Sequence, residues 1–235
     1  MAQDNATNQV STLTEVALRY PEKTFYLGQV FKDTTNSYKL FWLLALLSLL
    51  KRSEENFFCL TNIFTEMVVA AWHPVCLFRL SLGRQDKLQE VVLEFQKKSG
   101  LPLNANTEAI RKFVNGSADA LMKLEHFKRY VPTRFLTPWF ADKLRREPDD
   151  TVRTREIQTM AKESQKTPFA SLYYFDSSGA SDSIRFNDSW QAFLIEHLAL
   201  VQSFAEHSLK YREVMLPQTQ IAMNQGFQSG WKLRH

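Results

Sequence analysis

The sequence predicts a mainly α-helical protein, a multi-helix bundle around one buried central helix, with one short β-hairpin near residues 170–186. Three observations lead to this prediction. Residues 40–50 are apolar at every position except Ser48, so a helix formed by them must be surrounded by other elements. Several later segments repeat apolar residues at helical spacing. Glycine is scarce, at 7 residues, and phenylalanine is abundant, at 18, which favours a helix-rich aromatic core over a disordered chain.

The central helix is expected to begin near Ser37 and to end near Leu50. Thr34, Asn36 and Ser37 precede the apolar run, and each side chain can accept a hydrogen bond from a first-turn N–H group. The charged residues 51–55 end the run early, whereas a membrane span needs about 17–25 apolar residues. We therefore interpret the helix as the centre of a soluble core, and we expect no membrane partner.

The composition limits the possible chemistry and partners. Cys59 and Cys76 are too few for a disulfide framework or a cysteine-based zinc site, and we expect small buried side chains in a reducing compartment. Residues 1–25 contain no basic segment followed by a long apolar one, so a cytoplasmic location is predicted. The net charge of +4 comes from 29 basic and 25 acidic residues, a small excess that permits a polyanionic partner without indicating one.

The chain is expected to form five segments. Residues 1–30 are a polar tail with at most a short helix, and residues 31–140 form a helical core domain. Residues 141–168 are a charged connection. Residues 169–216 contain the hairpin and a long helix that packs on the core, and residues 217–235 are a C-terminal tail.

After the central helix, a second helix is expected to begin near Thr61. Its apolar face consists of Ile63, Met67, Val68 and Ala71. Pro74 disfavours helical geometry at His73, so this helix is expected to stop there. Residues 75–82, which Gly83 closes, are β-prone or extended.

Three more helices are expected in the core domain, at residues 84–98, 107–114 and 117–128. Asn115 and Gly116 separate the last two, and glycine is a common stop after a helix. The first of the three is amphipathic, with an inward face of Leu88, Val91, Val92 and Phe95.

Residues 129–140 differ from the helical segments. Pro132 and Pro138 oppose a regular helix, while the aromatic residues around them require burial, so an ordered loop across the core is expected.

The last third predicts the hairpin and the long helix. Two β-prone runs, residues 170–175 and 183–186, flank a group of turn residues. Asn187 offers a cap for the helix that follows, whose apolar face extends to about Val214.

Four short motifs occur in order along the chain. They are TTNSYKLFW at residues 34–42, AWHPV at 71–75, LSLGRQD at 80–86 and VPTRFLTPWF at 131–140. Together they resemble the region that precedes the nuclease module in a family of bacterial HNH-endonuclease-domain proteins, and the resemblance covers about residues 31–211. The residues that we assign to these motifs as structural are Tyr38, Lys39, Trp42, Trp72, His73, Pro74, Gly83, Asp86, Pro138 and Trp139.

The resemblance implies DNA, a nuclease domain or another protein as the partner, in a defence or restriction setting. HNH chemistry needs a histidine that activates water, a metal-binding His or Asp, and an orienting Asn. In the relatives these residues follow the final helix, but nothing of the kind follows Tyr211, and the tail holds only His235. We therefore assign no catalytic residue and no metal ligand.

The remaining histidines do not indicate an active site. His197 and His207 lie too far around one predicted helix to share a metal ion, and His73 is expected to be a capping or buried residue. The sequence contains no glycine-rich phosphate loop, nucleophile elbow or CxxC pair, so no cofactor is expected.

A nucleic-acid surface is suggested by the start of the helix at residues 84–98, because helix N-termini attract phosphate groups. The alternative is a glycine stop followed by a solvated turn, in which Asp86 suits the helix dipole. The candidate binding residues are Arg79, Arg84, Gln85, Lys87 and Arg134.

A second basic cluster is balanced by neighbouring acidic residues, and we interpret it as solvated surface. It consists of Lys143, Arg145, Arg146, Arg153 and Arg155.

Three functional hypotheses follow. The first is an accessory DNA-binding or DNA-positioning module that is not catalytic by itself. The second is a protein-interaction or structural helical module without affinity for nucleic acid, which the near-balanced charge and the aromatic content favour. The third is a truncated remnant of an HNH nuclease. Although the resembled family consists of endonucleases, an independent enzyme is not expected.

Overall fold

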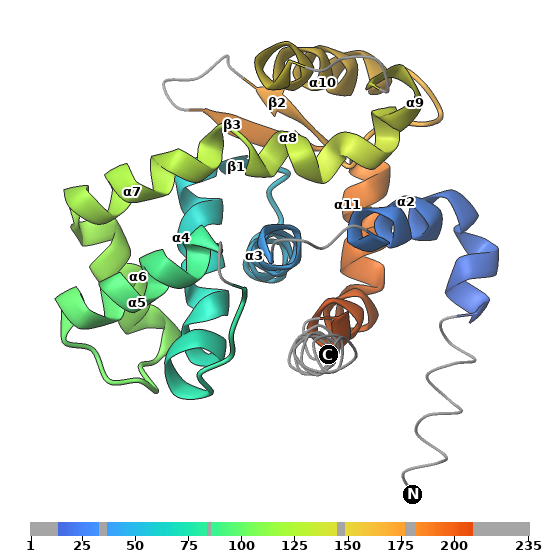
Figure 1. Ribbon diagram of the computed structural model, residues 1–235. Coiled ribbons are helices and arrows are strands. Elements are labelled where there is room, and N and C mark those ends of the chain that lie inside the picture. The colour runs from blue at the N-terminus through green and yellow to red at the C-terminus, as the bar shows by residue number, and fades with distance from the viewer. Residues whose placement is uncertain (1–13, 33–36, 84–85, 145–148, 177–181, 209–235) are drawn as a thin grey trace, which may run out of the picture.

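The computed structural model describes residues 14–32, 37–83, 86–144, 149–176 and 182–208, and it confirms a mainly α-helical fold around a buried central helix. That helix is α3 (Tyr38–Arg52), which Figure 1 shows nearly end-on with the other elements around it. Every side chain between Leu40 and Leu50 is buried except those of Leu44 and Ser48. The apolar run therefore forms a buried helix, as its composition predicts.

Residues 14–32 contain more helix than the short helix expected within residues 1–30. Residues 14–19 are helical, and α2 (Pro21–Lys32) follows and packs against α3. Leu27 and Val30 of α2 are buried, and the ring of Tyr26 stacks on Trp139 with 5.0 Å between the ring centroids. Residues 1–13 lie outside the described part of the chain.

The strand β1 (Phe57–Cys59) and the helix α4 (Leu60–Trp72) follow α3. The helix α4 stops at His73 as expected, but the chain stays helical beyond it in the π-helical turn η1 (His73–Leu77). Pro74 lies in the first turn of η1, where a helix needs no N–H donor, and Phe78 N–H donates to the His73 carbonyl oxygen at 2.9 Å. The expectation of an extended segment at residues 75–82 is therefore wrong at its start, and none of its residues forms a strand.

Three helices pack against α4 as expected: α5 (Lys87–Ser99), α6 (Thr107–Gly116) and α7 (Ala118–Lys128). Their N-caps are Asp86, Asn106 and Ser117. The start of α5 lies later than the expected position 84, and Arg84 and Gln85 lie outside the described residues.

The expected loop at residues 129–140 is helical. It forms α8 (Val131–Leu136) and the 3-10 turn η2 (Thr137–Phe140), and α9 (Ala141–Leu144) continues it. Pro132 and Pro138 each lie in the first turn of their element, where a helix needs no N–H donor.

The charged connection expected at residues 141–168 contains a regular helix, α10 (Asp150–Ser164). Asp149 caps it by accepting hydrogen bonds from Thr151 and Val152. Only Ile157 and Ala161 of this helix are buried, and it packs against α8 and the sheet.

The hairpin is confirmed as β2 (Tyr173–Asp176) and β3 (Ser183–Phe186), but a third strand was not expected. β1 pairs with β3 to give an antiparallel sheet of order β1-β3-β2. The long helix expected after the hairpin is interrupted: α11 (Asp188–Glu196) ends at His197, and residues 198–208 form a separate helical stretch. The remainder of that prediction and the tail at residues 217–235 lie outside the described residues.

Cys76 is buried as expected, whereas Cys59 is only half-buried, and the two cysteines do not form a disulfide. Within the described residues, none of the helices combines the length and the apolar character that crossing a bilayer requires.

Candidate nucleic-acid interface

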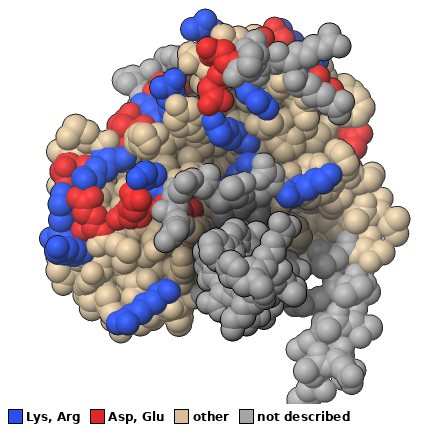
Figure 2. Space-filling view, viewed as in Figure 1, with Lys and Arg blue, Asp and Glu red and all other residues tan. Residues whose placement is uncertain are grey.

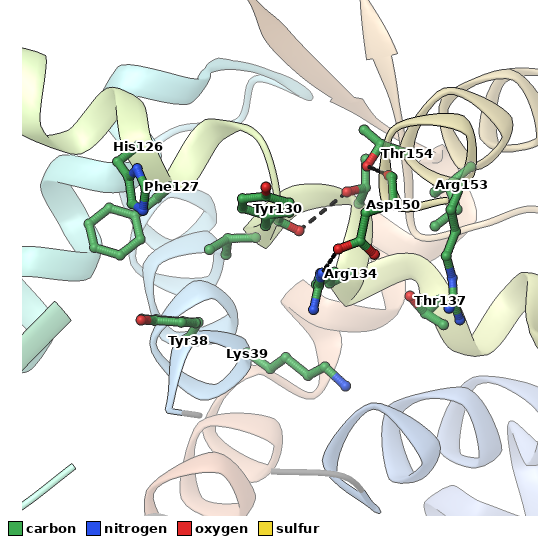
Figure 3. Close-up of a pocket in the computed structure, with 13 residues that line it drawn as sticks. Tyr38, Lys39, His126, Phe127, Tyr130, Arg134, Thr137, Asp150, Arg153 and Thr154 are labelled. Atoms are coloured by element: carbon green, nitrogen blue, oxygen red, sulfur yellow. Dashed lines mark hydrogen bonds and ion pairs between the residues drawn. The ribbon is translucent and has the colours of Figure 1, made fainter. Parts of the chain in front are cut away.

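A cavity of about 480 Å³ opens between α3, the end of α7, α8 and α10 (Figure 3). Each of these helices contributes side chains to it, and two of them, α8 and α10, are elements that the sequence did not predict as helices. The lining residues are Tyr38, Lys39, His126, Phe127, Tyr130, Val131, Thr133, Arg134, Thr137, Asp150, Arg153, Thr154 and Ile157.

The inner wall of the cavity is apolar and aromatic. Phe127, Val131 and Ile157 are buried and come from α7, α8 and α10. Tyr38 meets Phe127 edge to face, with 5.5 Å between their ring centroids. These contacts fix the wall through the same packing that holds the three helices together.

Two arginines flank Tyr130 at the start of α8. The guanidinium carbons of Arg129 and Arg134 lie 5.1 and 5.0 Å from the centre of the Tyr130 ring, within cation–π range. Arg129 donates to the Thr151 hydroxyl at 3.1 Å, and Arg134 pairs with Asp150 at 2.8 Å. The start of α10 therefore holds both arginines in place, although each contact is exposed and individually weak.

The lining of the cavity is rich in positive charge. Lys39, Arg134 and Arg153 line it together with a single carboxylate, that of Asp150, and Figure 3 shows the charged ends of the three basic side chains in the same part of the view. The guanidinium of Arg153 makes no hydrogen bond or ion pair with any other described residue. On the face drawn in Figure 2, Lys and Arg side chains gather near the centre, below α10. An anion is the ligand that this arrangement favours.

Tyr38 connects the cavity to the start of α5. Its hydroxyl accepts a hydrogen bond from the backbone N–H of Lys87 at 2.8 Å. Burial raises the pKa of the Tyr38 phenol, and the neighbouring Asp86 and Glu90 carboxylates act in the same direction, so the group is neutral at physiological pH. Lys87, one of the five candidate residues, therefore lies beside the cavity wall and pairs with Glu90 at 2.7 Å.

The N-terminus of α5 has no free N–H groups for a phosphate, which removes that part of the sequence-based hypothesis. Asp86 is buried and accepts from the N–H groups of Leu88 and Gln89 at 3.0 and 3.3 Å. The N–H of Lys87 is bonded to Tyr38, and that of Glu90 to the Asp86 carbonyl oxygen. The Asp86 carboxylate occupies the position where an anion would otherwise bind.

Ser37 is not the side-chain cap that the sequence suggested. Its hydroxyl and its backbone N–H both donate to Asp86, at 2.6 and 3.0 Å, so the two residues tie the start of α3 to the start of α5. Thr34 and Asn36 lie outside the described residues.

Replacing Ser37 by alanine is expected to lower the free energy of unfolding by about 1.5 kcal/mol, because the lost hydrogen bond has a buried, charged acceptor. Urea unfolding measures this change. Ser189→Ala, at an exposed serine near the start of α11, is the matched control and should leave stability within about 0.5 kcal/mol. Equal losses in the two variants would contradict the expectation.

The five candidate binding residues are not all brought together. Arg134 lines the cavity and Lys87 lies beside its wall, whereas Arg79 is exposed in the connection between η1 and α5, with a left-handed backbone (φ 54°). Arg84 and Gln85 lie outside the described residues. For Arg79, Lys87 and Arg134, a binding role stays a prediction.

The structural-motif residues take several positions. Tyr38 and Lys39 line the cavity, Gly83 has a positive φ of 112°, and the His73 imidazole bonds to the Ala105 carbonyl oxygen at 3.0 Å. Pro74 and Pro138 lie in first turns of helical elements, and the buried members are Trp42, Trp72, Asp86 and Trp139.

Sequence reasoning missed Tyr130, His126 and Arg153 as lining residues. Arg153 belongs to the basic cluster interpreted as solvated surface, and only the helical path of α10 separates it from Arg155, which does not line the cavity. A helix assignment for residues 150–164 was the signal that would have found it, because alternate positions on a helix face different directions. In the described part of the chain, no group of three or more His, Cys, Asp or Glu residues is placed to hold a metal ion.

No protein-family model, curated protein or solved structure matches this chain. The resemblance to HNH-associated regions therefore remains a prediction from the motifs.

Proposed function

We propose that this protein is an accessory nucleic-acid-binding module that holds or positions DNA through the cavity between α3, α8 and α10, and that it does not cut DNA by itself. The observation that carries the proposal is the charge of the lining, where Lys39, Arg134 and Arg153 meet one carboxylate. The nuclease activity would belong to a partner protein or to a separate nuclease domain.

Elementary electrostatics supports a polyanionic ligand. Each phosphate neutralised by a lysine or arginine releases condensed counterions, which makes binding favourable and dependent on salt. Asp150 pairs with Arg134, whereas the guanidinium of Arg153 makes no hydrogen bond or ion pair with any other described residue, so its charge can serve an anion. The overall net charge of +4 is small, so the cavity is a local feature that composition alone does not indicate.

Two of the four motifs that carry the family resemblance line this cavity, which is a second line of support. Tyr38 and Lys39 come from the first motif, and Thr133, Arg134 and Thr137 come from the fourth. The third motif adjoins them through the hydrogen bonds of Asp86 to Ser37. A shared DNA-holding role explains why segments far apart in sequence would carry one resemblance.

Replacing Arg153 by glutamine is expected to weaken DNA binding and to reduce the salt slope of log K by about 0.9, the effect of one lost phosphate contact. Fluorescence anisotropy of a labelled DNA duplex and of its separated strand, measured across a salt series, tests this. Arg155→Gln is the matched control, because it removes the same charge from the same helix at a position outside the cavity.

The control also decides the outcome. If Arg155→Gln weakens binding as much as Arg153→Gln, the effect is one of general charge and the cavity has no special role. If the native chain shows no salt-dependent binding to either form of DNA, the proposed function is wrong.

The alternative is a protein-interaction module, and one observation favours it. Leu77 and Phe78 expose 41% and 65% of their surface at the end of η1, which is unusual for neighbouring large apolar residues. A stable protein complex without nucleic acid, detected by light scattering after pull-down, would support this alternative. The third hypothesis, a nuclease remnant, requires HNH residues encoded in a neighbouring reading frame.

A further inference from the structure

We infer that the cavity accepts one unpaired nucleotide of a polynucleotide strand, so that the ligand of this module is single-stranded nucleic acid or a duplex region with an extruded base. This inference rests on the proposed function and specifies its ligand. Three features of the cavity support it: its shape, its combination of apolar and charged residues, and the arrangement around Tyr130.

The shape excludes the outer surface of a duplex as the best ligand. Proteins read duplex DNA with convex elements, such as a helix that enters the major groove, because the base edges lie inside the grooves. The described cavity is concave, and its volume of about 480 Å³ lies within the range of pockets that enclose small organic ligands. A nucleotide that is unstacked from its neighbours can enter such a pocket, whereas a stacked base pair cannot.

The lining contains both apolar and positively charged residues, which match the base and the phosphates of a nucleotide. Phe127, Val131 and Ile157 form a buried apolar wall that suits the faces of a base. Lys39, Arg134 and Arg153 also line the cavity, and Figure 3 shows their charged ends in the same part of the view; these groups suit the phosphates on either side of the nucleotide. The hydroxyl of Thr137 makes no hydrogen bond within the described residues, so it can serve a base edge or a sugar.

The planar groups at the start of α8 lie close together without a ligand, through contacts that are individually weak. Arg129 and Arg134 lie within 5.1 Å of the centre of the Tyr130 ring, and α10 anchors both through Thr151 and Asp150. Guanidinium planes and aromatic rings are the surfaces on which single-stranded bases stack, and stacking tolerates any base. The pocket is therefore expected to prefer unpaired strands without strong sequence preference.

A substitution that fills the cavity but leaves its charge unchanged tests this inference separately from the proposed function. Thr154 lines the cavity, and its hydroxyl donates to the carbonyl oxygen four residues earlier, at 2.8 Å. Thr159 makes the same kind of bond, at 3.1 Å, on a part of α10 outside the cavity. Thr154→Trp is expected to weaken single-strand binding about tenfold or more, whereas Thr159→Trp should leave it unchanged.

The experiment measures anisotropy for the native chain and both variants with labelled oligothymidylate, oligouridylate and a blunt DNA duplex at one salt concentration. The native chain is expected to bind a single strand more tightly than the duplex, and the comparison of the two oligonucleotides identifies DNA or RNA as the source. Thermal unfolding confirms that Thr154→Trp folds. If Thr154→Trp does not fold, a competition experiment on the native chain takes its place. Thymidine monophosphate is then expected to displace the labelled single strand.

Two outcomes would overturn the inference, and they differ from the failure of the proposed function. Tighter binding of the duplex by the native chain refutes it, as does equal single-strand binding by the two tryptophan variants. In both cases a response to Arg153→Gln would leave the DNA-holding role intact. Absence of binding to every probe refutes the proposed function itself.

Discussion

Replacing Glu66 by glutamine is expected to lower the free energy of unfolding by about 3–5 kcal/mol, because the change removes the one buried charge that binds both Arg52 and Arg111. Glu66 lies on α4 and exposes 3% of its surface. Arg111 of α6 donates to it at 2.6 and 3.1 Å, and Arg52 and Ser48 of α3 bind it at 2.7 and 2.9 Å. Denaturant unfolding at neutral pH measures the loss.

The contribution of Glu66 is expected to depend on pH in one direction. Burial by itself would raise the pKa of this carboxyl group, but hydrogen bonds from Arg111 and Ser48 and the charges of Arg52 and Arg111 together hold its pKa below the ordinary value of 4.5. The unfolded chain therefore binds a proton more readily, so the stabilisation is complete above the ordinary pKa and is lost as the pH falls through the folded pKa. The stability gap between the native chain and Glu66→Gln should narrow below pH 4.5.

Glu108 provides the matched control for this prediction. It pairs with the same arginine, Arg111, at 3.5 Å, but its side chain is 83% exposed. Glu108→Gln is expected to change stability by less than about 1 kcal/mol. If the two variants lose equal stability, burial of the Glu66 network is not what makes it important.

Local sequence patterns correctly predicted the helices whose apolar residues and caps lie within one continuous segment. The central helix α3 follows from an apolar run that no surface helix needs, and α5, α6 and α7 follow from periodic apolar residues with caps nearby. In each case the side chains that define the element also bury it. The start of α5 was predicted too early, directly after Gly83, because the cap that begins the helix is Asp86.

The elements that were missed depend on contacts between distant segments. The strand β1 has three residues and exists because it pairs with β3, more than a hundred positions later. The helix α10 buries only Ile157 and Ala161, so its sequence resembles a solvated connection. In α8 and η2, the prolines fall in first turns, where they are compatible with a helix and do not oppose it.

The candidate site, too, combines residues that local patterns predict with an arrangement that depends on contacts between distant segments. Tyr38, Lys39 and Arg134 could be selected from sequence because they lie in motifs, but the cavity that joins them needs the placement of α8 against α10. Ser37 and Asp86 each look like a local helix cap, and only Asp86 is one. The hydroxyl of Ser37 bonds to Asp86, a contact across 49 positions that no local pattern indicates.

Replacing Tyr173 by phenylalanine is expected to lower the free energy of unfolding by about 3 kcal/mol, because it removes two buried hydrogen bonds and leaves the Trp42 indole N–H without this acceptor. The Tyr173 hydroxyl accepts from the Trp42 indole N–H at 3.0 Å and donates to the Pro132 carbonyl oxygen at 2.6 Å. It therefore joins α3, α8 and β2 behind the cavity. Burial raises the pKa of Tyr173 well above its ordinary value, so the phenol keeps the proton that this bond needs.

Tyr174→Phe is the matched control, because Tyr174 is the neighbouring residue of β2, is only half-buried and has no hydrogen bond from its hydroxyl within the described residues. Denaturant unfolding of both variants, followed by tryptophan fluorescence, tests the prediction. Among the described residues, the indole N–H groups of Trp72 and Trp139 have no hydrogen-bond partner, so an unpaired indole is tolerated at some cost. If Tyr173→Phe costs no more than Tyr174→Phe, the hydroxyl does not stabilise the junction of α3 and α8, and packing of the ring alone holds these two helices behind the cavity.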